Sequence, residues 1–183
     1  MFTIPDLDQR GANAQNPCTG REEADDERGS VLLLRHASAG VRLSSPEIDR
    51  FRRLDDEGRV VARQLVWSLA AHEITRIVSS PLARCVESVV PIAESRHLSV
   101  ESHWELEPDV PLDDLMTLLA DLPDTSLVCT HREVFQLLLG WDVTCEKGGA
   151  WVLERRGPEL APTLYVEPPA AVGAGDRRTV STA

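Results

Sequence analysis

The chain has 183 residues, 42% of them hydrophobic, and a formal net charge of -11 at neutral pH. A chain of this length builds one hydrophobic core and is too short for two substantial domains. Its acidic balance argues against a surface for DNA, RNA or anionic lipid, because such partners are held by clusters of Lys and Arg. We therefore expect one domain, no nucleic-acid partner, and only a local site for any anion.

The sequence also lacks the signals of membrane insertion and export. No apolar run approaches the roughly 20 residues needed to span a bilayer, and residues 1–20 lack the basic start and apolar region of a signal peptide. The cysteines Cys18, Cys85, Cys129 and Cys145 do not show the spacing of a metal site. We expect a cytoplasmic protein with no membrane partner, no zinc and no disulfide bonds.

The predicted elements begin after an acidic segment. Residues 1–29 combine Pro, Gly, Asn and a run of Asp and Glu without apolar periodicity, which predicts a disordered arm. From residue 30 onward, apolar runs end in polar residues, as in strands that are buried on both faces. We predict, in chain order, a strand over 31–34, a helix over 56–70, a strand over 74–79, a helix over 81–94 with Pro81 as its first residue, a strand over 98–101, a helix over 112–122, a strand over 126–130 and a helix over 134–139.

The chain is expected to close with a hairpin. Residues 151–153 and 163–166 form its strands, with Gly157 and Pro158 between them, and residues 169–183 form a flexible tail. Alternating strands and helices predict an α/β fold, a three-layer α/β/α sandwich with a mostly parallel central sheet over residues 30–168.

Charged and imidazole side chains follow three of these strands. Arg35 and His36 end the first strand, Arg84 lies in the first turn of the helix after the second, and His131 follows the strand over 126–130. Parallel strands bring their carboxyl ends to one edge of a sheet, so these residues should meet there. Two Arg and two His together need an anion to compensate them, and a phosphoryl group fits this role.

Four strings of residues carry a resemblance to a known family. The strings are LLLRHASAG, LDDEG, SSPLARCVES and THRE. In this order the chain resembles the histidine phosphatase superfamily, also called phosphoglycerate mutase-like, over residues 30 to 166. Within it, partly through the later string KGGAWVLER, the chain is similar to short bacterial phosphohistidine phosphatases and to phosphatase modules that accompany Nudix hydrolases. The resemblance implies a phosphoglycerate mutase-like fold and a phosphohydrolase that needs no cofactor or metal.

The resemblance also implies roles for individual residues. His36 would attack phosphorus as a neutral imidazole and form a phosphohistidine intermediate, while Arg35, Arg84 and His131 would hold the phosphoryl oxygens. A Glu after the third strand would protonate the leaving group and later activate water. Glu105 is the chosen candidate, and Glu107 and Asp109 are its alternatives.

One departure from the family pattern concerns the substrate. Arg132 stands where a small residue commonly follows the second His, so it either narrows the pocket or adds a cation for a second phosphate. Ser38 and Arg42 are further candidates for the mouth of the site. We predict a phosphatase for a phosphohistidine protein or a small phosphorylated metabolite. The alternatives are a phosphatase for nucleotides or other polyphosphorylated ligands, and a non-catalytic phosphate-binding scaffold. The sequence carries no signal for the oligomeric state.

Overall fold

The computed structural model describes residues 29–157 and 159–171. The predicted arm up to residue 28, Pro158 of the hairpin turn, and residues 172–183 of the predicted tail lie outside the described residues. The elements in chain order are β1 (Ser30–Arg35), α1 (Pro46–Asp49), α2 (Asp56–Ser68), β2 (Arg76–Ser79), α3 (Ala83–Arg96), β3 (Val100–Ser102), the short 3-10 helix η1 (Trp104–Leu106), α4 (Leu112–Asp121), β4 (Ser126–Thr130), α5 (Arg132–Leu139), β5 (Ala150–Arg156) and β6 (Glu159–Val166).

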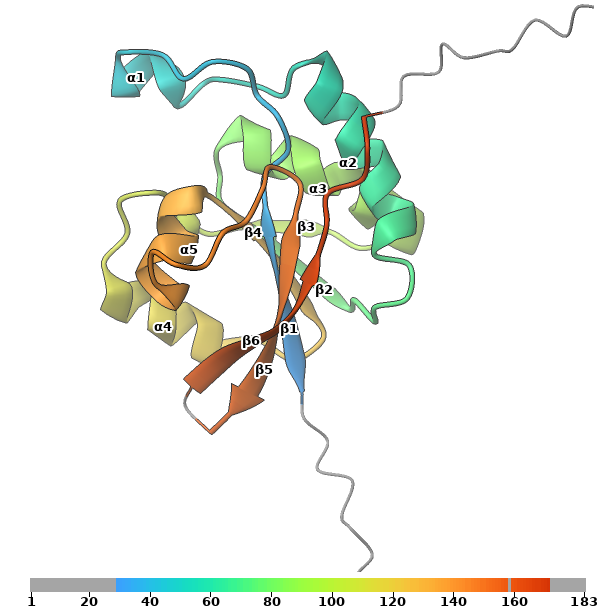
Figure 1. Cartoon of the computed structure of the whole chain (residues 1–183), viewed down its shortest axis with the longest axis vertical. Coiled ribbons are helices and arrows are strands. Elements are labelled where there is room, and N and C mark those ends of the chain that lie inside the picture. The colour runs from blue at the N-terminus through green and yellow to red at the C-terminus, as the bar shows by residue number, and fades with distance from the viewer. Residues whose placement is uncertain (1–28, 158, 172–183) are drawn as a thin grey trace, which may run out of the picture.

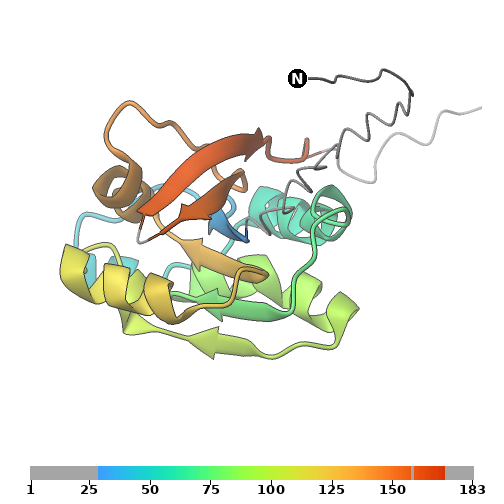
Figure 2. The same ribbon diagram turned by 90° about the horizontal axis from the view of Figure 1, so that it is seen from below.

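The six strands form one mostly parallel sheet in the order β3-β2-β4-β1-β5-β6. Its four strands β3, β2, β4 and β1 are parallel, and Leu33 of β1 pairs with Val128 of β4. On its other side β1 pairs with β5 in antiparallel fashion, and β5 and β6 form the predicted hairpin, as Figure 2 shows from below. The four parallel strands therefore deliver their carboxyl ends to one edge, at the top of Figure 1.

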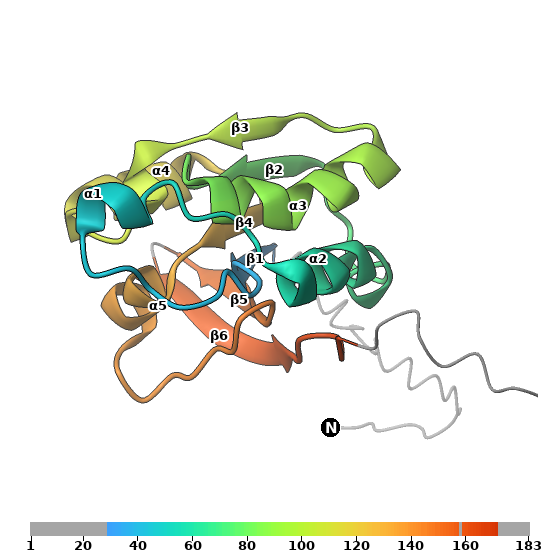
Figure 3. The same ribbon diagram turned by 90° about the horizontal axis from the view of Figure 1, so that it is seen from above.

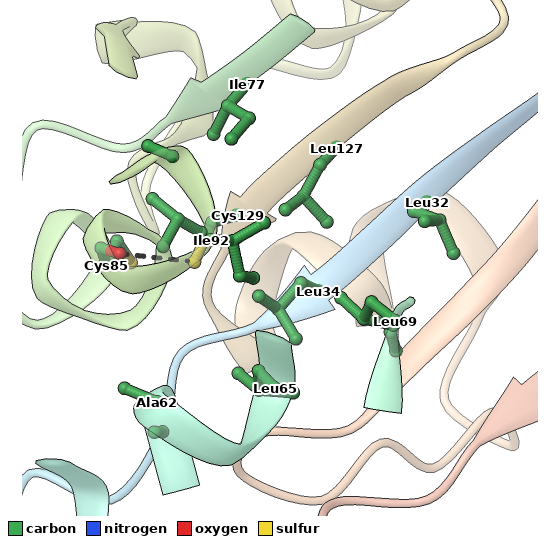
Figure 4. Close-up of a cluster of buried hydrophobic side chains, with 14 of the residues drawn as sticks. Leu32, Leu34, Ala62, Leu65, Leu69, Ile77, Cys85, Ile92, Leu127 and Cys129 are labelled. Carbon is green, nitrogen blue, oxygen red and sulfur yellow. Dashed lines mark hydrogen bonds between the residues drawn. The ribbon is translucent and has the colours of Figure 1, made fainter. Parts of the chain in front are cut away.

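Helices cover both faces of the sheet, which confirms the predicted α/β class and its three layers. Helices α2 and α3 lie on one side, and α4 and α5 on the other (Figure 1). Strand β1 alternates between the two cores, because Leu32 and Leu34 pack toward α2 and α3, whereas Val31 and Leu33 pack toward α4 and α5. Figure 4 shows Leu34 in the first core, beside Leu65 of α2.

Helix α3 begins later than the sequence pattern predicts. Pro81 was expected as its first residue, but α3 starts at Ala83 and Leu82 is its N-cap. Leu82 has extended backbone angles, φ -68° and ψ 133°, so the helical conformation cannot include it or Pro81. The prediction for Pro81 is therefore wrong, whereas Arg84 still falls in the first turn, as expected.

Two short elements were not predicted at all. Helix α1 has four residues and η1 has three, which is too short for apolar periodicity to show. Figure 3 shows α1 from above, at the carboxyl-end edge of the sheet. Among residues 29–157 and 159–171, no helix has the length and apolar character required to cross a membrane.

Candidate active site

The structure brings Arg35, His36, Arg84 and His131 to one cavity. They line a volume of about 270 Å³ at the carboxyl ends of β1 and β4 and the first turn of α3. The imidazole rings of His36 and His131 are 5.2 Å apart between centroids, at an interplanar angle of 61°. Residues from three separate parts of the chain therefore form a single cationic and imidazole-lined pocket, as the strand topology predicts.

His36 is held in an orientation suited to nucleophilic attack. Its side chain is buried, and its ring Nδ1 is 2.8 Å from the carbonyl oxygen of Ala37. A carbonyl accepts only, so Nδ1 donates its proton and the neutral ring keeps its lone pair on Nε2. The backbone N–H of Ala37 in turn donates to Ser88 Oγ of α3 at 2.9 Å, which anchors the loop behind the imidazole.

Burial and nearby cations keep both imidazoles neutral. Burial lowers the pKa of His36 to about 3, and the charges of Arg84 and Arg35 act in the same direction against the hydrogen bond to Ala37. Burial likewise lowers the pKa of His131 to about 2, and the neighbouring His36 and Arg84 act in the same direction. At neutral pH the pocket therefore presents uncharged imidazoles beside two guanidinium groups.

The two arginines are fixed by backbone carbonyl groups and keep further donors available. Arg35 Nη1 donates to the carbonyl oxygen of Cys145 at 2.6 Å, and Arg84 Nη1 donates to that of Asp49 at 3.0 Å. The Nε of each arginine is buried and has no hydrogen-bond partner among the described residues. An unpaired buried donor is costly, so a bound oxyanion would stabilise both side chains.

The Ser-Ser-Pro segment positions the second histidine. Ser80 Oγ lies 2.9 Å from His131 Nε2, and Cys85 Sγ lies 3.4 Å from the same nitrogen. His131 is also the N-cap residue of α5, so the end of β4 and the start of α5 determine its backbone position. The motif SSPLARC therefore supplies both Arg84 and the side chains that contact His131.

The LDDEG segment fixes the loop that follows His36. Asp55 caps α2 by accepting from the Gly58 N–H at 2.7 Å, and its other oxygen accepts from Ser38 Oγ and the Gly40 N–H at 2.7 and 2.8 Å. Gly58 is required by close packing, because a Cβ there would lie 1.9 Å from the Ser38 carbonyl oxygen. The segment thus attaches α2 directly to the nucleophile loop.

The structure separates the predicted substrate-binding residues. Arg42 and Arg132 line the cavity with His36, whereas Ser38 does not and instead lines a neighbouring cavity that shares Arg35 with the first. The hydroxyl of Ser38 is occupied by Asp55, so its observed role is to hold the loop.

The predicted proton donor also lies outside the cavity lining. Glu105 belongs to η1, and its Oε2 is buried, 3.6 Å from His103 Nδ1, without a hydrogen-bond partner among the described residues. Its alternative Glu107 is paired with Arg50 at 2.6 Å, and Asp109 is exposed. Of this loop, the cavity lining contains Pro108. The geometry therefore gives Glu105 no support as a proton donor.

Four charged residues of the lining were missed by the sequence analysis: Asp49, Arg52, Glu133 and Lys147. Asp49 is buried and accepts from Arg52 Nε at 2.8 Å, and it lies 3.8 Å from Arg84 Nη1. Burial raises the pKa of Asp49, but the hydrogen bonds from Arg52 and the Leu43 N–H outweigh it and lower this pKa to about 2. Its carboxylate therefore stays ionised and orients the neighbouring arginines.

Lys147 is the single lysine of the whole chain, and this rarity was a usable signal. It precedes Gly148, which has φ +82° and whose N–H donates to the carbonyl oxygens of Arg35 and His36 at 3.0 and 3.2 Å. A left-handed conformation of this kind favours glycine, so the KGG string is a turn that closes over the end of β1.

Among the described residues, no group of three or more His, Cys, Asp or Glu side chains lies in a position to hold a metal ion. The thiols of Cys85, Cys129 and Cys145 are free and buried, and Cys18 lies outside the described residues. The positive charge of the pocket comes from guanidinium and ammonium groups.

Comparison with known proteins agrees with this geometry. Residues 31–107 match the family described as histidine phosphatase superfamily, branch 1. This segment contains β1 with Arg35 and His36, the LDDEG segment, and the start of α3 with Arg84. Over these residues the chain is similar to the histidine phosphatase superfamily. The family match ends before His131, which the fold brings to the same cavity.

Individual proteins resemble the chain at low identity. An 8-oxo-(d)GTP phosphatase of Mycolicibacterium smegmatis is 28% identical over 158 residues, which cover 76% of this chain but 48% of that protein. The chain thus spans about half the length of this curated relative. The protein histidine phosphatase SixA in complex with tungstate shares the fold with a TM-score of 0.64, at 20% identity over 76% of this chain and 97% of SixA. YhfR of Bacillus stearothermophilus has a TM-score of 0.63, at 14% identity over 78% of this chain and 98% of YhfR.

Proposed function

We propose that the protein is a metal-independent phosphatase that transfers a phosphoryl group to His36 and then to water. One observation carries this proposal: the neutral His36, oriented through the Ala37 carbonyl, shares a cavity with Arg35, Arg84 and His131. Two guanidinium groups supply the charge that stabilises the phosphoryl oxygens, a task that metal ions perform in many phosphoryl-transfer enzymes.

The proposed reaction has two steps. In the first, Nε2 of His36 forms a bond to phosphorus while the bond between phosphorus and the leaving group breaks. Arg35, Arg84 and His131 hold the three remaining oxygens, where negative charge is spread in the transition state. In the second, water attacks phospho-His36, the nitrogen recovers its electron pair, and inorganic phosphate leaves.

The substrate we propose at this level is a phosphohistidine protein or a small phosphorylated metabolite. The names of two similar proteins support both classes, since one is a protein histidine phosphatase and the other an 8-oxo-(d)GTP phosphatase. The cavity opens at the carboxyl-end edge of the sheet, and the connection from α3 to β4 contains only β3, η1 and α4. This leaves little chain for a lid, which suits a bulky or protein-borne substrate.

The experiment compares the protein with His36→Ala on p-nitrophenyl phosphate in the presence of EDTA between pH 5 and 8. We expect hydrolysis by the protein, its loss in His36→Ala, and an acid-labile, alkali-stable phosphoprotein that His36→Ala does not form. His97→Asn is the matched control, because His97 is exposed and asparagine tolerates its positive φ of 56°. Activity no higher than that of His36→Ala would leave a phosphate-binding scaffold and overturn the phosphatase.

A further inference from the structure

The cavity around His36 carries more positive charge than one phosphoryl group requires. Its lining contains six cationic side chains and two carboxylates, a formal excess of four positive charges in a chain of net charge -11. The cations are Arg35, Arg42, Arg52, Arg84, Arg132 and Lys147, and the carboxylates are Asp49 and Glu133. A single phosphate ester carries at most two negative charges, so a substrate with more charge would match this lining better.

Both carboxylates of the lining are already engaged by arginines. Asp49 receives Nε and Nη2 of Arg52 at 2.8 and 3.2 Å, so the Arg52 fork is directed to it. Glu133 pairs with Arg42 Nη1 at 3.1 Å. Arg84 Nη1 also lies 3.8 Å from Asp49, so Arg52 and Arg84 share this one carboxylate. Among the described residues, the cations of the lining without an ion pair are Arg35 beside His36, together with Arg132 and Lys147.

Arg132 and Lys147 stand at the exposed rim of the same cavity. Within residues 29–157 and 159–171, neither side chain forms an ion pair or a hydrogen bond. Arg132 follows His131 directly. Burial lowers the pKa of the Arg35 guanidinium, and the nearby charge of Arg132 lowers it further. Lys147 is tied to the nucleophile strand through the Gly148 N–H, which donates to the His36 carbonyl at 3.2 Å. Both cations therefore lie next to the phosphoryl position without sharing its contacts.

We infer that Arg132 and Lys147 bind a second phosphoryl group, so that the substrate is a phosphoanhydride with a terminal diphosphate. This rests on the proposed phosphatase function and narrows its substrate class. The terminal phosphoryl group lies at His36 between Arg35 and Arg84, and the penultimate group lies toward the rim, between the two remaining cations. Charge-assisted hydrogen bonds to phosphate are among the stronger polar contacts that proteins make.

A phosphoanhydride substrate is consistent with a lining in which, among the described residues, both carboxylates are paired with arginines. His36 Nε2 bonds to the terminal phosphorus as the bridging P–O bond breaks, and the electron pair of that bond stays on the penultimate phosphate. This group leaves as an anion that Arg132 and Lys147 stabilise, and it needs no proton. Water then forms an O–P bond, the N–P bond breaks with its electrons returning to Nε2, and the proton of water passes to solvent.

The test measures kcat/KM for ADP, inorganic pyrophosphate, AMP and p-nitrophenyl phosphate. We expect at least one of the two diphosphates to exceed AMP by a factor of ten or more. Preference for ADP over pyrophosphate identifies a diphosphate ester, and the reverse identifies the inorganic anhydride. Equal values for AMP and both diphosphates, with p-nitrophenyl phosphate still hydrolysed, would overturn the second site while leaving the phosphatase intact.

Variants assign the effect to the two cations. Arg132→Gln and Lys147→Gln keep much of the side-chain length, and each should lower kcat/KM for the preferred diphosphate about tenfold to a hundredfold more than for p-nitrophenyl phosphate. Arg63→Ala, on the exposed side of α2, should change neither value. Thermal unfolding establishes that each variant is folded, and either one suffices for the comparison. If kcat/KM fell equally for the diphosphate and for p-nitrophenyl phosphate, the two cations would only attract anions in general, and the proposed second phosphate site would be overturned.

Discussion

The rings of His36 and His131 lie 5.2 Å apart in an edge-on arrangement, although one follows β1 and the other precedes α5. Each ring is buried, and the presence of His36 helps to lower the pKa of His131. The pair thus has a consequence for stability as well as for the reaction, because the unfolded chain imposes no such restraint.

The first prediction concerns stability at acidic pH. Burial lowers the pKa of His36 to about 3 and that of His131 to about 2, whereas an unfolded histidine titrates near 6.5. Well above pH 6.5 both rings are neutral in the folded protein and in the unfolded chain, so they leave the free energy of unfolding unchanged there. As pH falls from 6.5 toward 3, the unfolded chain takes up protons that the folded protein refuses, and the free energy of unfolding decreases.

The measurement is urea unfolding in phosphate-free buffer at several pH values from 7 to 4.5. His131→Gln should reduce the dependence of the unfolding free energy on pH by about 1 kcal/mol per pH unit. His97→Asn, at an exposed position, serves as the control. Parallel curves for the protein and His131→Gln would show that His131 is already charged in the folded state.

The second prediction concerns the buried carboxylate that orients the arginines. Asp49→Asn keeps the shape but removes the charge between Arg52 and Arg84, whose side chains are 13% and 5% exposed. Breaking a buried ion pair leaves an uncompensated charge, so we expect a loss of about 3 kcal/mol in the free energy of unfolding. Inorganic phosphate should restore part of it, because an anion would again lie between the cations.

Urea unfolding with and without phosphate measures both effects, and Asp142→Asn is the control at an exposed aspartate. An unchanged midpoint for Asp49→Asn would mean that the ion pair contributes nothing to folding. We also expect a lower kcat/KM, since Arg84 is attached to the same residue through its backbone carbonyl at 3.0 Å.

The third prediction concerns the contact between α2 and the nucleophile loop. Replacing Gly by Ala inside a helix ordinarily stabilises it by up to about 1 kcal/mol. At Gly58 the added Cβ would lie 1.9 Å from the Ser38 carbonyl oxygen, so the backbone has to move. We expect Gly58→Ala to lose about 1–3 kcal/mol of stability and much of its activity. A stabilised and fully active Gly58→Ala variant would contradict this, and Arg63→Ala on the same helix is the control.

The fourth prediction concerns Glu105, which stays outside the cavity lining. We expect Glu105→Gln to change kcat by the same factor for p-nitrophenyl phosphate and for an alkyl phosphate, whose leaving group is much poorer. An acid that protonates the leaving oxygen matters most when that leaving group is poor. A selective loss on the alkyl phosphate would establish Glu105 as the proton donor after all.

Local sequence patterns predict the strands, the four longer helices α2, α3, α4 and α5, and the four residues at the centre of the cavity. Apolar runs predict β1, β2 and β4 because a strand buried on both faces has to be apolar, and parallel pairing then brings Arg35, Arg84 and His131 together by topology alone. The recurring strings around these residues follow from local needs, such as the Asp55 cap and the close approach at Gly58.

Long-range contacts place the other charged side chains of the cavity. Asp49 and Arg52 belong to a short helix and loop with no periodic signal, and Lys147 lies in a turn fixed by contacts with the distant strand β1. Glu105 illustrates the converse, because a carboxylate near the site in sequence lies in η1, outside the cavity lining. Loop side chains are placed by long-range packing and hydrogen bonds, which a local pattern does not encode, whereas the ends of buried strands are placed by the sheet itself.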